Sequence, residues 1–321
     1  MVEDRRATVV GVGMYLLAAM LFAFNGSLAK AAMNAGLDPV ALTELRNAGA
    51  MVVLFVYLLI RNPKSMRVHK GEWGFLIAYG VLAFAVVQFL YFFTISRLSV
   101  GIGTLLAYLA PVVVAVWIRF GRKEPVSGRL WLAIGFTVGG LALVAQIPPG
   151  TQIDVIGVLA GLLLAVALAL YWILGENGQR TRDPLSLTMW GFTFATLAWS
   201  VMAPWWNFPW ADLLLRSLPL RPDWPAFPVW ALMIWVVLMG TIAPFLLVLG
   251  SLKRIGAQRA GIVGSTEPIW AFLLAFIFLG ETVSTIQAIG AMVVLAGVFV
   301  AETSRRTKRG EESPDFLPSH P

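Results

Sequence analysis

Residues 96–145 read SRLSVGIGTLLAYLAPVVVAVWIRFGRKEPVSGRLWLAIGFTVGGLALVA, and residues 253–302 read KRIGAQRAGIVGSTEPIWAFLLAFIFLGETVSTIQAIGAMVVLAGVFVAE. Aligned without a gap at an offset of 157, the two stretches share six identical residues, among them Pro111 with Pro268 and Gly140 with Gly297. Each stretch closes a block of apolar segments. The offset therefore indicates an internal repeat, in which the chain builds one arrangement of helices twice.

The composition is that of a membrane protein rather than of a soluble domain. The chain has 59% hydrophobic and 13% charged residues and a mean hydropathy of +0.79, whereas a soluble domain carries about 25% charged residues. It contains no cysteine, which excludes disulfides and thiolate metal sites. The two histidines, His69 and His320, lie in a connection and in the tail, and no metal, phosphate-binding or nucleophile motif accompanies them. We therefore expect no enzyme, no cofactor and no metal.

Ten stretches are long and apolar enough to cross the hydrocarbon core, which needs about 20 helical residues. Three of them contain a lone proline, which is tolerated in a membrane helix and is expected to kink it. These prolines are Pro111, Pro244 and Pro268. The ten predicted spans are residues 9–32, 40–60, 73–95, 100–119, 130–147, 155–174, 185–206, 228–250, 260–279 and 285–302.

The spans divide into two blocks of five, and an odd number forces the second block to cross the membrane in the opposite direction to the first. The predicted fold is therefore an all-α integral membrane protein with ten transmembrane helices in a five-plus-five inverted repeat around a central cavity. Inverted repeats are a common plan of secondary transporters. The predicted segments are an N-terminus (1–8), a first repeat (9–147), a second repeat (155–303) and a disordered basic tail (304–321).

The basic residues predict the orientation, because Lys and Arg accumulate in cytoplasmic connections. Nineteen of the 24 lie at the termini or in connections on the side of the N-terminus, and Lys30 and Arg46 lie within or near spans. The other side has three, Arg97, Arg216 and Arg221. Both termini are therefore predicted to be cytoplasmic. The net charge of +7 reflects this topology, so no nucleic acid partner is expected.

The one long connection on the outer side, residues 207–227, is rich in proline and tryptophan. Its tryptophans fit an aromatic belt at the membrane surface, and a short surface helix is expected around residues 211–218. An external lid is the alternative.

Two pairs of glycines place small residues one helical turn apart, Gly135 with Gly139 and Gly157 with Gly161. Small residues let membrane helices approach closely, so we expect all four to pack inside the bundle. Dimerisation through these faces is the alternative, and the sequence leaves a monomer or a homodimer open.

Glu267 is the outstanding polar residue at membrane depth. A charge there is costly and usually faces a partner or a wet cavity. Counted along its span at about 1.5 Å per residue, Glu267 lies near the midplane. It is a candidate for proton coupling or for contact with a substrate amine, and a structural hydrogen bond or ion pair is the alternative.

Lys30, Glu44 and Arg46 form a second polar group. Lys30 and Glu44 are each seven residues from the first outer turn, so they have similar depth on adjacent helices and are candidates for an ion pair. Arg46 points about 200° away from Glu44 around the helix, and a side chain two positions on does not share its face. Arg46 is then free to bind a substrate carboxylate or to brace a neighbouring helix.

Several other polar or aromatic residues within the spans are candidates for the wall of the cavity. Each of them, taken alone, has packing as its alternative role. They are Asn25, Gln88, Tyr91, Tyr108, Tyr171, Trp172 and Trp190.

Several short motifs together resemble a known family. The front halves share Asp38-Pro39-Val40-Ala41-Leu42-Thr43 and Asp183-Pro184-Leu185-Ser186-Leu187-Thr188, and the first is followed by Arg46-Asn47. The second repeat contains Ser251-Leu252-Lys253-Arg254-Ile255-Gly256-Ala257, Thr266-Glu267-Pro268 and Leu279-Gly280-Glu281. Over residues 10–303 the chain resembles the EamA family of the drug/metabolite transporter superfamily.

The resemblance implies ten helices in a five-plus-five inverted repeat and a carrier in the bacterial inner membrane, often an exporter of amino acids, related metabolites or toxic compounds. The chain departs from the family pattern at Ala110-Pro111, which lacks an acidic residue. Our leading hypothesis is a secondary transporter that works by alternating access on a small-molecule substrate, with protons as a candidate coupling ion. The alternatives are a membrane scaffold that transports nothing and a carrier of nucleosides or drugs.

Overall fold

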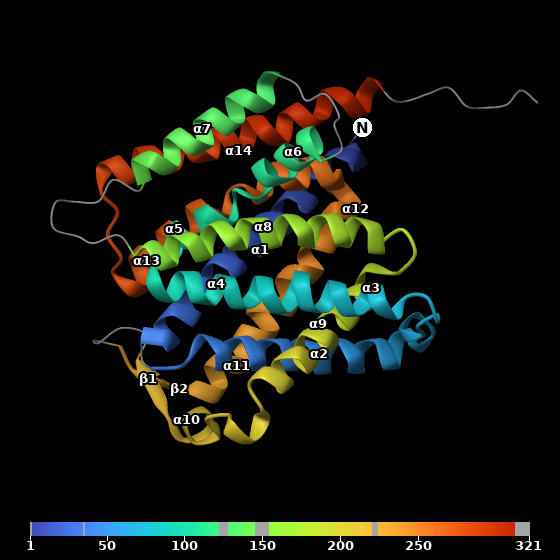
Figure 1. The fold of residues 1–321 in the computed structure, drawn as a ribbon, viewed down its shortest axis with the longest axis vertical. Helices are drawn as coiled ribbons and strands as arrows, with labels where there is room; N and C mark the ends of the chain where they lie inside the picture. Colours follow the sequence, from blue (N-terminus) through green and yellow to red (C-terminus); the bar gives the residue numbers. More distant parts are fainter. Residues whose placement is uncertain (1, 35, 122–127, 145–153, 220–223, 312–321) are drawn as a thin grey trace, which may run out of the picture.

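The computed structural model describes residues 2–34, 36–121, 128–144, 154–219 and 224–311, which are almost entirely helical (Figure 1). The first half comprises α1 (Val2–Asn34), α2 (Pro39–Arg61), the 3-10 helix η1 (Pro63–Met66), α3 (Trp73–Ala78), the π-helical η2 (Tyr79–Ala85), α4 (Val86–Arg97), α5 (Val100–Ala107), α6 (Ala110–Phe120) and α7 (Gly128–Val144).

The second half begins with α8 (Val155–Gly178), α9 (Pro184–Met202), the 3-10 helix η3 (Trp205–Asn207), α10 (Trp210–Leu215), β1 (Ser217–Pro219) and β2 (Ala226–Pro228). It continues with α11 (Val229–Val237), the π-helical η4 (Leu238–Ile242), α12 (Ala243–Gly264), α13 (Glu267–Leu279) and α14 (Thr285–Glu311).

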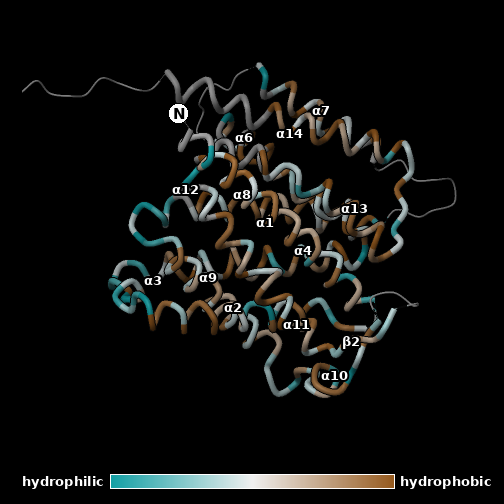
Figure 2. The backbone as a smooth tube through the Cα atoms, turned by 180° about the vertical axis from the view of Figure 1, so that it is seen from behind, coloured by the Kyte–Doolittle hydropathy of each residue, from teal (hydrophilic) through white to brown (hydrophobic). Residues whose placement is uncertain are grey.

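The bundle has two ends. The start of α1 and the connections from α2 to α3 and from α8 to α9 lie on the right in Figure 1 and form what we call the N-terminal end. The two strands lie at the opposite end, which we call the hairpin end. Hydrophobic residues dominate the helices between these ends, and hydrophilic residues gather in the connections beside α3 (Figure 2).

Six helical stretches in the described residues are long and apolar enough to cross a membrane, so the chain is a multi-span membrane protein. They confirm six of the predicted spans. The apolar helical stretches at the other four predicted positions are shorter, 100–114, 131–141, 267–279 and 285–300. The six stretches are 6–34, 39–61, 73–97, 155–175, 184–202 and 229–248.

The expectation of a purely helical fold is wrong at the hairpin end. The predicted surface helix forms but ends at Leu215, and β1 then pairs antiparallel with β2, with Leu218 opposite Phe227. Prolines at 219 and 228 lie at the ends of the strands, and a residue without an amide hydrogen is tolerated there but ends a helix.

The tail prediction is also wrong in part, because α14 continues to Glu311 instead of ending near 302. Basic residues 305–309 fall in its last turns, where they favour a helix C-terminus. The rest of the predicted tail, 312–321, lies outside the described residues.

The chain reverses direction within α12. Gly240, just before it, lies against Asn25 of α1, and Ser251 Oγ donates to the Gly11 carbonyl 2.7 Å away. Gly264, at the end of α12, lies against Tyr15. A straight helix from 251 to 264 would advance about 20 Å at 1.5 Å per residue, yet its contacts on α1 move back towards the hairpin end. The turn lies where the sequence predicts a connection at the N-terminal end.

Contacts that a helix of the first half makes with the second half recur when the two halves are exchanged. In the first half α1 packs on α12 and α13, and in the second half its counterpart α8 packs on α4 and α5. Two further pairs join counterparts directly: α2 with α9 and α7 with α14. Such reciprocal contacts are what a two-fold relation between equivalent surfaces produces.

The crossing of α7 and α14 shows the exchange at the level of atoms. A Cβ atom at Gly140 would lie 2.7 Å from the Gly290 carbonyl oxygen and 2.7 Å from the Val294 amide nitrogen. Gly297 is Gly140 shifted by 157. A Cβ atom there would lie 2.8 Å from the Ala133 carbonyl oxygen and 3.0 Å from the Thr137 amide nitrogen, which are the same two groups 157 residues earlier. The contacts run antiparallel, so the offset found in the sequence is a relation between packed backbones.

The front of each half repeats as well, at an offset of 145. Asp38 caps α2 and Asp183 caps α9, and each accepts a hydrogen bond from the amide two residues on. The Thr43 and Thr188 hydroxyls each donate to the carbonyl four residues back, at 2.7 and 2.8 Å. The shared Asp-Pro motif therefore specifies the same helix start twice.

The expectation that the glycine pairs pack inside the bundle holds for only one of them. Gly157 lies against Leu98 and Gly161 against Leu106. Gly135 and Gly139 are exposed, with no atom within 4 Å of a Cβ placed there. On α7 the contact face passes through Gly140 instead.

We expect Gly140→Val to lower the thermal stability of the protein, because its Cβ atom would meet backbone atoms of α14. Overpacking of this kind costs about 1–3 kcal/mol. The matched control is Gly139→Val on the adjacent, exposed position, which should leave the melting temperature almost unchanged. Thermal unfolding in detergent, followed by tryptophan fluorescence, measures both; equal melting temperatures for the two variants would contradict the packing described here.

Candidate functional site

Two membrane helices are broken at equivalent points. In the first half α5 ends at Ala107 and α6 begins at Ala110, and in the second half α12 ends at Gly264 and α13 begins at Glu267. The two breaks differ by the repeat offset of 157. Interrupted helices at corresponding positions of two halves point to a binding site.

The three prolines expected to kink their helices all lie at helix starts: Pro111 in α6, Pro244 in α12 and Pro268 in α13. Proline has no amide hydrogen to continue the ladder of the preceding turn. The π-helical η4 lies directly before Pro244, and η2 occupies the corresponding place in the first half. Single π-helical turns are often found at functional sites.

The two breaks touch each other through Tyr108 and Glu267. Tyr108 lies in the first break, and its hydroxyl is 2.9 Å from Glu267 Oε2 and 2.8 Å from the Gly264 carbonyl oxygen. Glu267 is the first residue of α13, where the positive end of the helix dipole favours a carboxylate. Two residues that the sequence proposed for different roles, cavity wall and coupling, therefore form one contact between the halves.

Arg46 braces α2 against η4. Its Nε donates to Thr241 Oγ1 at 2.8 Å, and its guanidinium lies 5.5 Å from the centre of the Phe92 ring. The residue is 5% exposed. The sequence left two roles open for Arg46, binding a substrate carboxylate and bracing a neighbouring helix. These contacts match the bracing role.

The ion pair expected between Lys30 and Glu44 does not form. Lys30 Nζ donates to the carbonyl oxygens of Ser96 and Leu98 at 3.0 and 3.1 Å. These carbonyls close α4 and carry the negative end of its dipole. Glu44 is buried, and its Oε1 has no hydrogen-bond partner among the described residues. Equal depth did not bring the two together, because a helix end offered the ammonium group better acceptors.

Asn25, Gln88 and Tyr91 lie in the buried layer around these contacts. Asn25 touches Gly240 and is 1% exposed, and its Oδ1 has no partner among the described residues. Gln88 is 9% exposed, and the Tyr91 hydroxyl lies against Gly26. All three remain candidates for a polar path between the breaks and the cavity.

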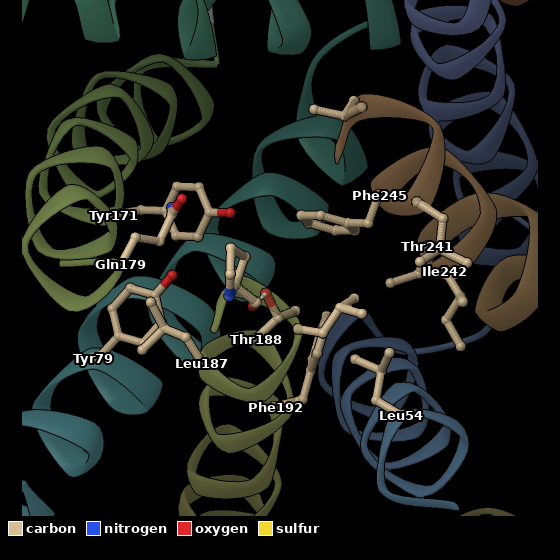
Figure 3. A pocket seen from close by; sticks show the side chains of 14 residues that line it. Leu54, Tyr79, Tyr171, Gln179, Leu187, Thr188, Phe192, Thr241, Ile242 and Phe245 are labelled. Atoms are coloured by element: carbon tan, nitrogen blue, oxygen red, sulfur yellow. Dashed lines mark hydrogen bonds between the residues drawn. The ribbon is translucent and has the colours of Figure 1, made fainter. Parts of the chain in front are cut away.

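A cavity of about 130 Å³ opens beside this layer, on the side of the N-terminal end. Tyr171 of α8, one of the candidates for a cavity wall, is among its lining residues, and Thr241 lies between the cavity and Arg46. Figure 3 shows Tyr79, Tyr171 and Gln179 along one side and Leu54, Phe245 and Ile242 along the other. Sequence reasoning missed most of these residues; the only signal was the Asp-Pro motif, which places Thr188 one turn into α9.

Trp172 and Trp190 lie outside the cavity. Trp172 packs on a buried cluster that joins α6 and α8. Trp190 donates its Nε1 hydrogen to the Met66 carbonyl at 3.2 Å and contacts the Trp73 ring edge-on. Neither is among the residues that line the cavity, and the contacts of both are packing contacts.

A polar cluster joins the two halves at the N-terminal end. Arg182, between α8 and α9, forms a 2.8 Å ion pair with Glu72. It also donates to the carbonyl oxygens of Ser65 and Arg67 and to the Ser186 hydroxyl. The hydrogen bond from Arg182, together with the bond from the amide of residue 69, lowers the pKa of Glu72 below its usual range. The sequence identified Arg182 only as a topology signal.

Comparison with known proteins gives a consistent result. The model of the EamA-like transporter family matches residues 9–146 and 155–303. An "uncharacterized transporter" of Archaeoglobus fulgidus is 26% identical, covering 91% of this chain and 96% of its own. A threonine/homoserine exporter of Escherichia coli is 26% identical over 78% of each chain, and an "uncharacterized inner membrane transporter" of Salmonella typhimurium is 23% identical over 94% and 99%. A crystal structure with a TM-score of 0.57 and 20% identity covers 94% of this chain and 99% of its own, and shares the fold.

We expect Glu72→Gln to destabilise the protein at neutral pH but not in acid. Because the folded-state pKa is lowered, the stabilisation is complete above the unfolded pKa and is lost as pH falls through the folded pKa. The difference in unfolding free energy, up to about 1 kcal/mol for a partly exposed pair, should be the same at pH 7 and 6 and should disappear near pH ~3. Asp212→Asn is the control, because Asp212 forms a looser 3.8 Å exposed pair with Arg216. A difference that persists in acid would show that Glu72 acts through packing and not through its charge.

Proposed function

Because the chain belongs to the EamA-like transporter family, we propose that it is a secondary transporter that exports amino acids or related small metabolites across the bacterial inner membrane. The observation that carries the proposal is a cavity lined by residues of both halves, in a fold that has two helices broken at matching positions. The named activity of the Escherichia coli relative supports the substrate class and the direction of transport. The name of the Salmonella typhimurium relative supports the inner membrane.

The size of the cavity supports a small metabolite over the alternatives. Pockets for drug-sized ligands occupy about 300–1,000 Å³, and this cavity has about 130 Å³. A scaffold that transports nothing would need neither a cavity nor a carboxyl group buried at the helix breaks. Protons are the proposed coupling ion, with Glu267 as their site.

The architecture proposed for this function has ten spans, five in each of two inverted repeats, 9–147 and 155–303. The reciprocal contacts of α7 and α14 support it, because an antiparallel crossing of equivalent helices requires an axis in the plane of the membrane. The distribution of basic residues supports cytoplasmic termini. The N-terminal end then faces the cytoplasm, and so does the cavity.

Alternating access follows from the way the two halves depart from symmetry. In the first half α4 packs on α1 and α2 and closes the hairpin end. In the second half the counterpart of α4 is α12, and the described residues give it no comparable packing on α8 or α9. The cavity occupies the space left between them. Exchanging these two arrangements between the halves would close the cavity to the cytoplasm and open it to the outside.

The exchange makes a residue-level prediction. Tyr91 of α4 contacts Gly26 of α1 in the closed half. The counterpart of Tyr91, at the offset of 157, is Val248, and the counterpart of Gly26, at the offset of 145, is Tyr171. Both counterparts line the open cavity. The chain has no cysteine, so Tyr171→Cys with Val248→Cys adds a unique pair. We expect a disulfide to form under oxidation, which requires Cα atoms within about 7 Å, and to arrest transport until it is reduced.

The control pair is Leu170→Cys with Val248→Cys. Leu170 precedes Tyr171 on α8 but is 42% exposed, so this pair should stay reduced and active. Cross-linking is followed by a mobility shift, and flux by labelled substrate in proteoliposomes. Full flux in the cross-linked Tyr171 and Val248 pair would contradict alternating access at this cavity.

Proton coupling is tested with Glu267→Gln in proteoliposomes loaded with labelled threonine. Wild-type efflux should be accelerated by a pH gradient. Glutamine keeps the size of the side chain and can still accept from Tyr108, but it cannot release a proton, so acceleration should disappear while exchange of labelled for unlabelled threonine persists. Glu44→Gln is the matched control: Glu44 is also a buried carboxyl group within a span, but it does not contact the breaks. A pH-accelerated Glu267→Gln variant would show that the residue is structural. Absence of flux for every amino acid tested, in correctly inserted wild-type protein, would refute the proposed function.

A further inference from the structure

The cavity has no charged residue in its lining. All fourteen described residues that line it are uncharged. Five have a polar group, and the others are apolar. The polar five are Tyr79, Tyr171, Gln179, Thr188 and Thr241.

One side of the cavity is aromatic and hydroxyl-bearing, and the opposite side is mostly apolar, with Thr241 beside Ile242. In Figure 3 the Tyr79 and Tyr171 rings flank one side of the cavity, close to Gln179. The two rings are nearly parallel, with centres 6.1 Å apart. Across the cavity, the Phe192 and Phe245 rings stand edge to face with centres 6.4 Å apart. The cavity is therefore amphipathic, with a hydroxyl-bearing aromatic wall and an apolar wall.

A fixed cation, Arg46, lies behind the floor of the cavity. Arg46 Nε donates to Thr241 Oγ1 at 2.8 Å, and Thr241 is itself a lining residue. The Thr241 hydroxyl donates in turn to the Val236 carbonyl at 3.0 Å. The guanidinium therefore makes the floor electropositive without placing a charge in the cavity.

We infer, on the basis of the proposed function, that the substrate is an electroneutral amino acid with an apolar side chain. Its carboxylate lies towards the Thr241 floor, in the field of Arg46. Its ammonium group lies beside the Tyr171 ring, since aromatic faces attract cations. Its side chain packs on Phe245, which sets specificity.

The same geometry disfavours the neighbouring classes of amino acid. A second carboxylate or a second cationic group would be taken out of water beside the apolar wall without a counter-charge, which is unfavourable. A short hydroxylated side chain is tolerated, but it leaves the accessible side of the Phe245 ring without an apolar contact from the substrate. Apolar amino acids should therefore bind more tightly than threonine or homoserine, and charged amino acids most weakly.

The test is an exchange assay in proteoliposomes that contain the full chain. Efflux of labelled leucine is measured against external leucine, phenylalanine, threonine, homoserine, lysine and glutamate. We expect the apolar pair to drive exchange at concentrations about tenfold lower than threonine, since apolar groups in such pockets discriminate by about 10–200-fold. Lysine and glutamate should drive none at the highest concentration used.

A specificity variant sharpens the test. Phe245→Ala should raise the KM for leucine about tenfold while changing that for threonine less than about twofold. Phe245→Leu, which keeps the wall apolar, should retain the preference for leucine if the alanine variant does not fold. Phe276→Ala is the control, because Phe276 is 56% exposed on α13 and faces away from the cavity.

The outcomes separate this inference from the proposed function. Lysine or glutamate driving exchange as well as leucine would overturn the inference and leave the proposed function standing. So would exchange of threonine with no exchange of leucine, or equal changes of both KM values in Phe245→Ala. A lack of exchange with every amino acid would overturn both.

Discussion

A helix can be interrupted inside a bilayer only where other protein groups satisfy the backbone atoms that the break sets free. The break before α13 leaves the Gly264 carbonyl oxygen, and the Tyr108 hydroxyl lies 2.8 Å from it. The same hydroxyl reaches Glu267. Since Tyr108 lies in the break between α5 and α6, the interrupted helices of the two halves meet at their breaks. In the proposed alternating access, a movement of one half against the other would change this contact.

Freed carbonyl groups also explain which partners the cationic side chains bind. Lys30 binds the last carbonyls of α4, and Arg182 binds carbonyls of the connection after α2. Arg46 lies against η4, where it bonds Thr241 and approaches the Gly240 carbonyl. Helix ends and π-helical turns offer acceptors that a continuous α-helix does not. The cations therefore fasten one element to another, and the cavity is left with polar but uncharged walls.

Sequence patterns predicted what depends on position along the chain. The offset of 157 aligned Gly140 with Gly297 and Pro111 with Pro268, and these positions lie at the α7 and α14 crossing and at the matched breaks; the shared Asp-Pro motif aligned Asp38 with Asp183, which cap α2 and α9. What depends on direction around a helix axis was not predictable. Lys30 and Glu44 have similar depth but different partners, and Tyr171 lines the cavity whereas Trp172 is not among its lining residues. Hydropathy records depth alone, because in lipid both faces of a helix are apolar.

The two halves also differ in the connections that cover the two ends of the bundle. At the hairpin end, Phe208, Leu213 and Leu218 of the long connection are buried in one cluster with Leu37 and with residues of α4 and α11. The corresponding connection of the first half, 62–72, is shorter and polar, and Arg182 holds it through hydrogen bonds. Opening the hairpin end would expose a contiguous apolar cluster to water, which is unfavourable in proportion to its area. Opening the N-terminal end requires only that polar groups replace their hydrogen bonds to one another by hydrogen bonds to water. In the proposed transport cycle, the longer connection would therefore favour a cavity open at the N-terminal end, and substrate binding would have to supply the free energy to reverse that preference.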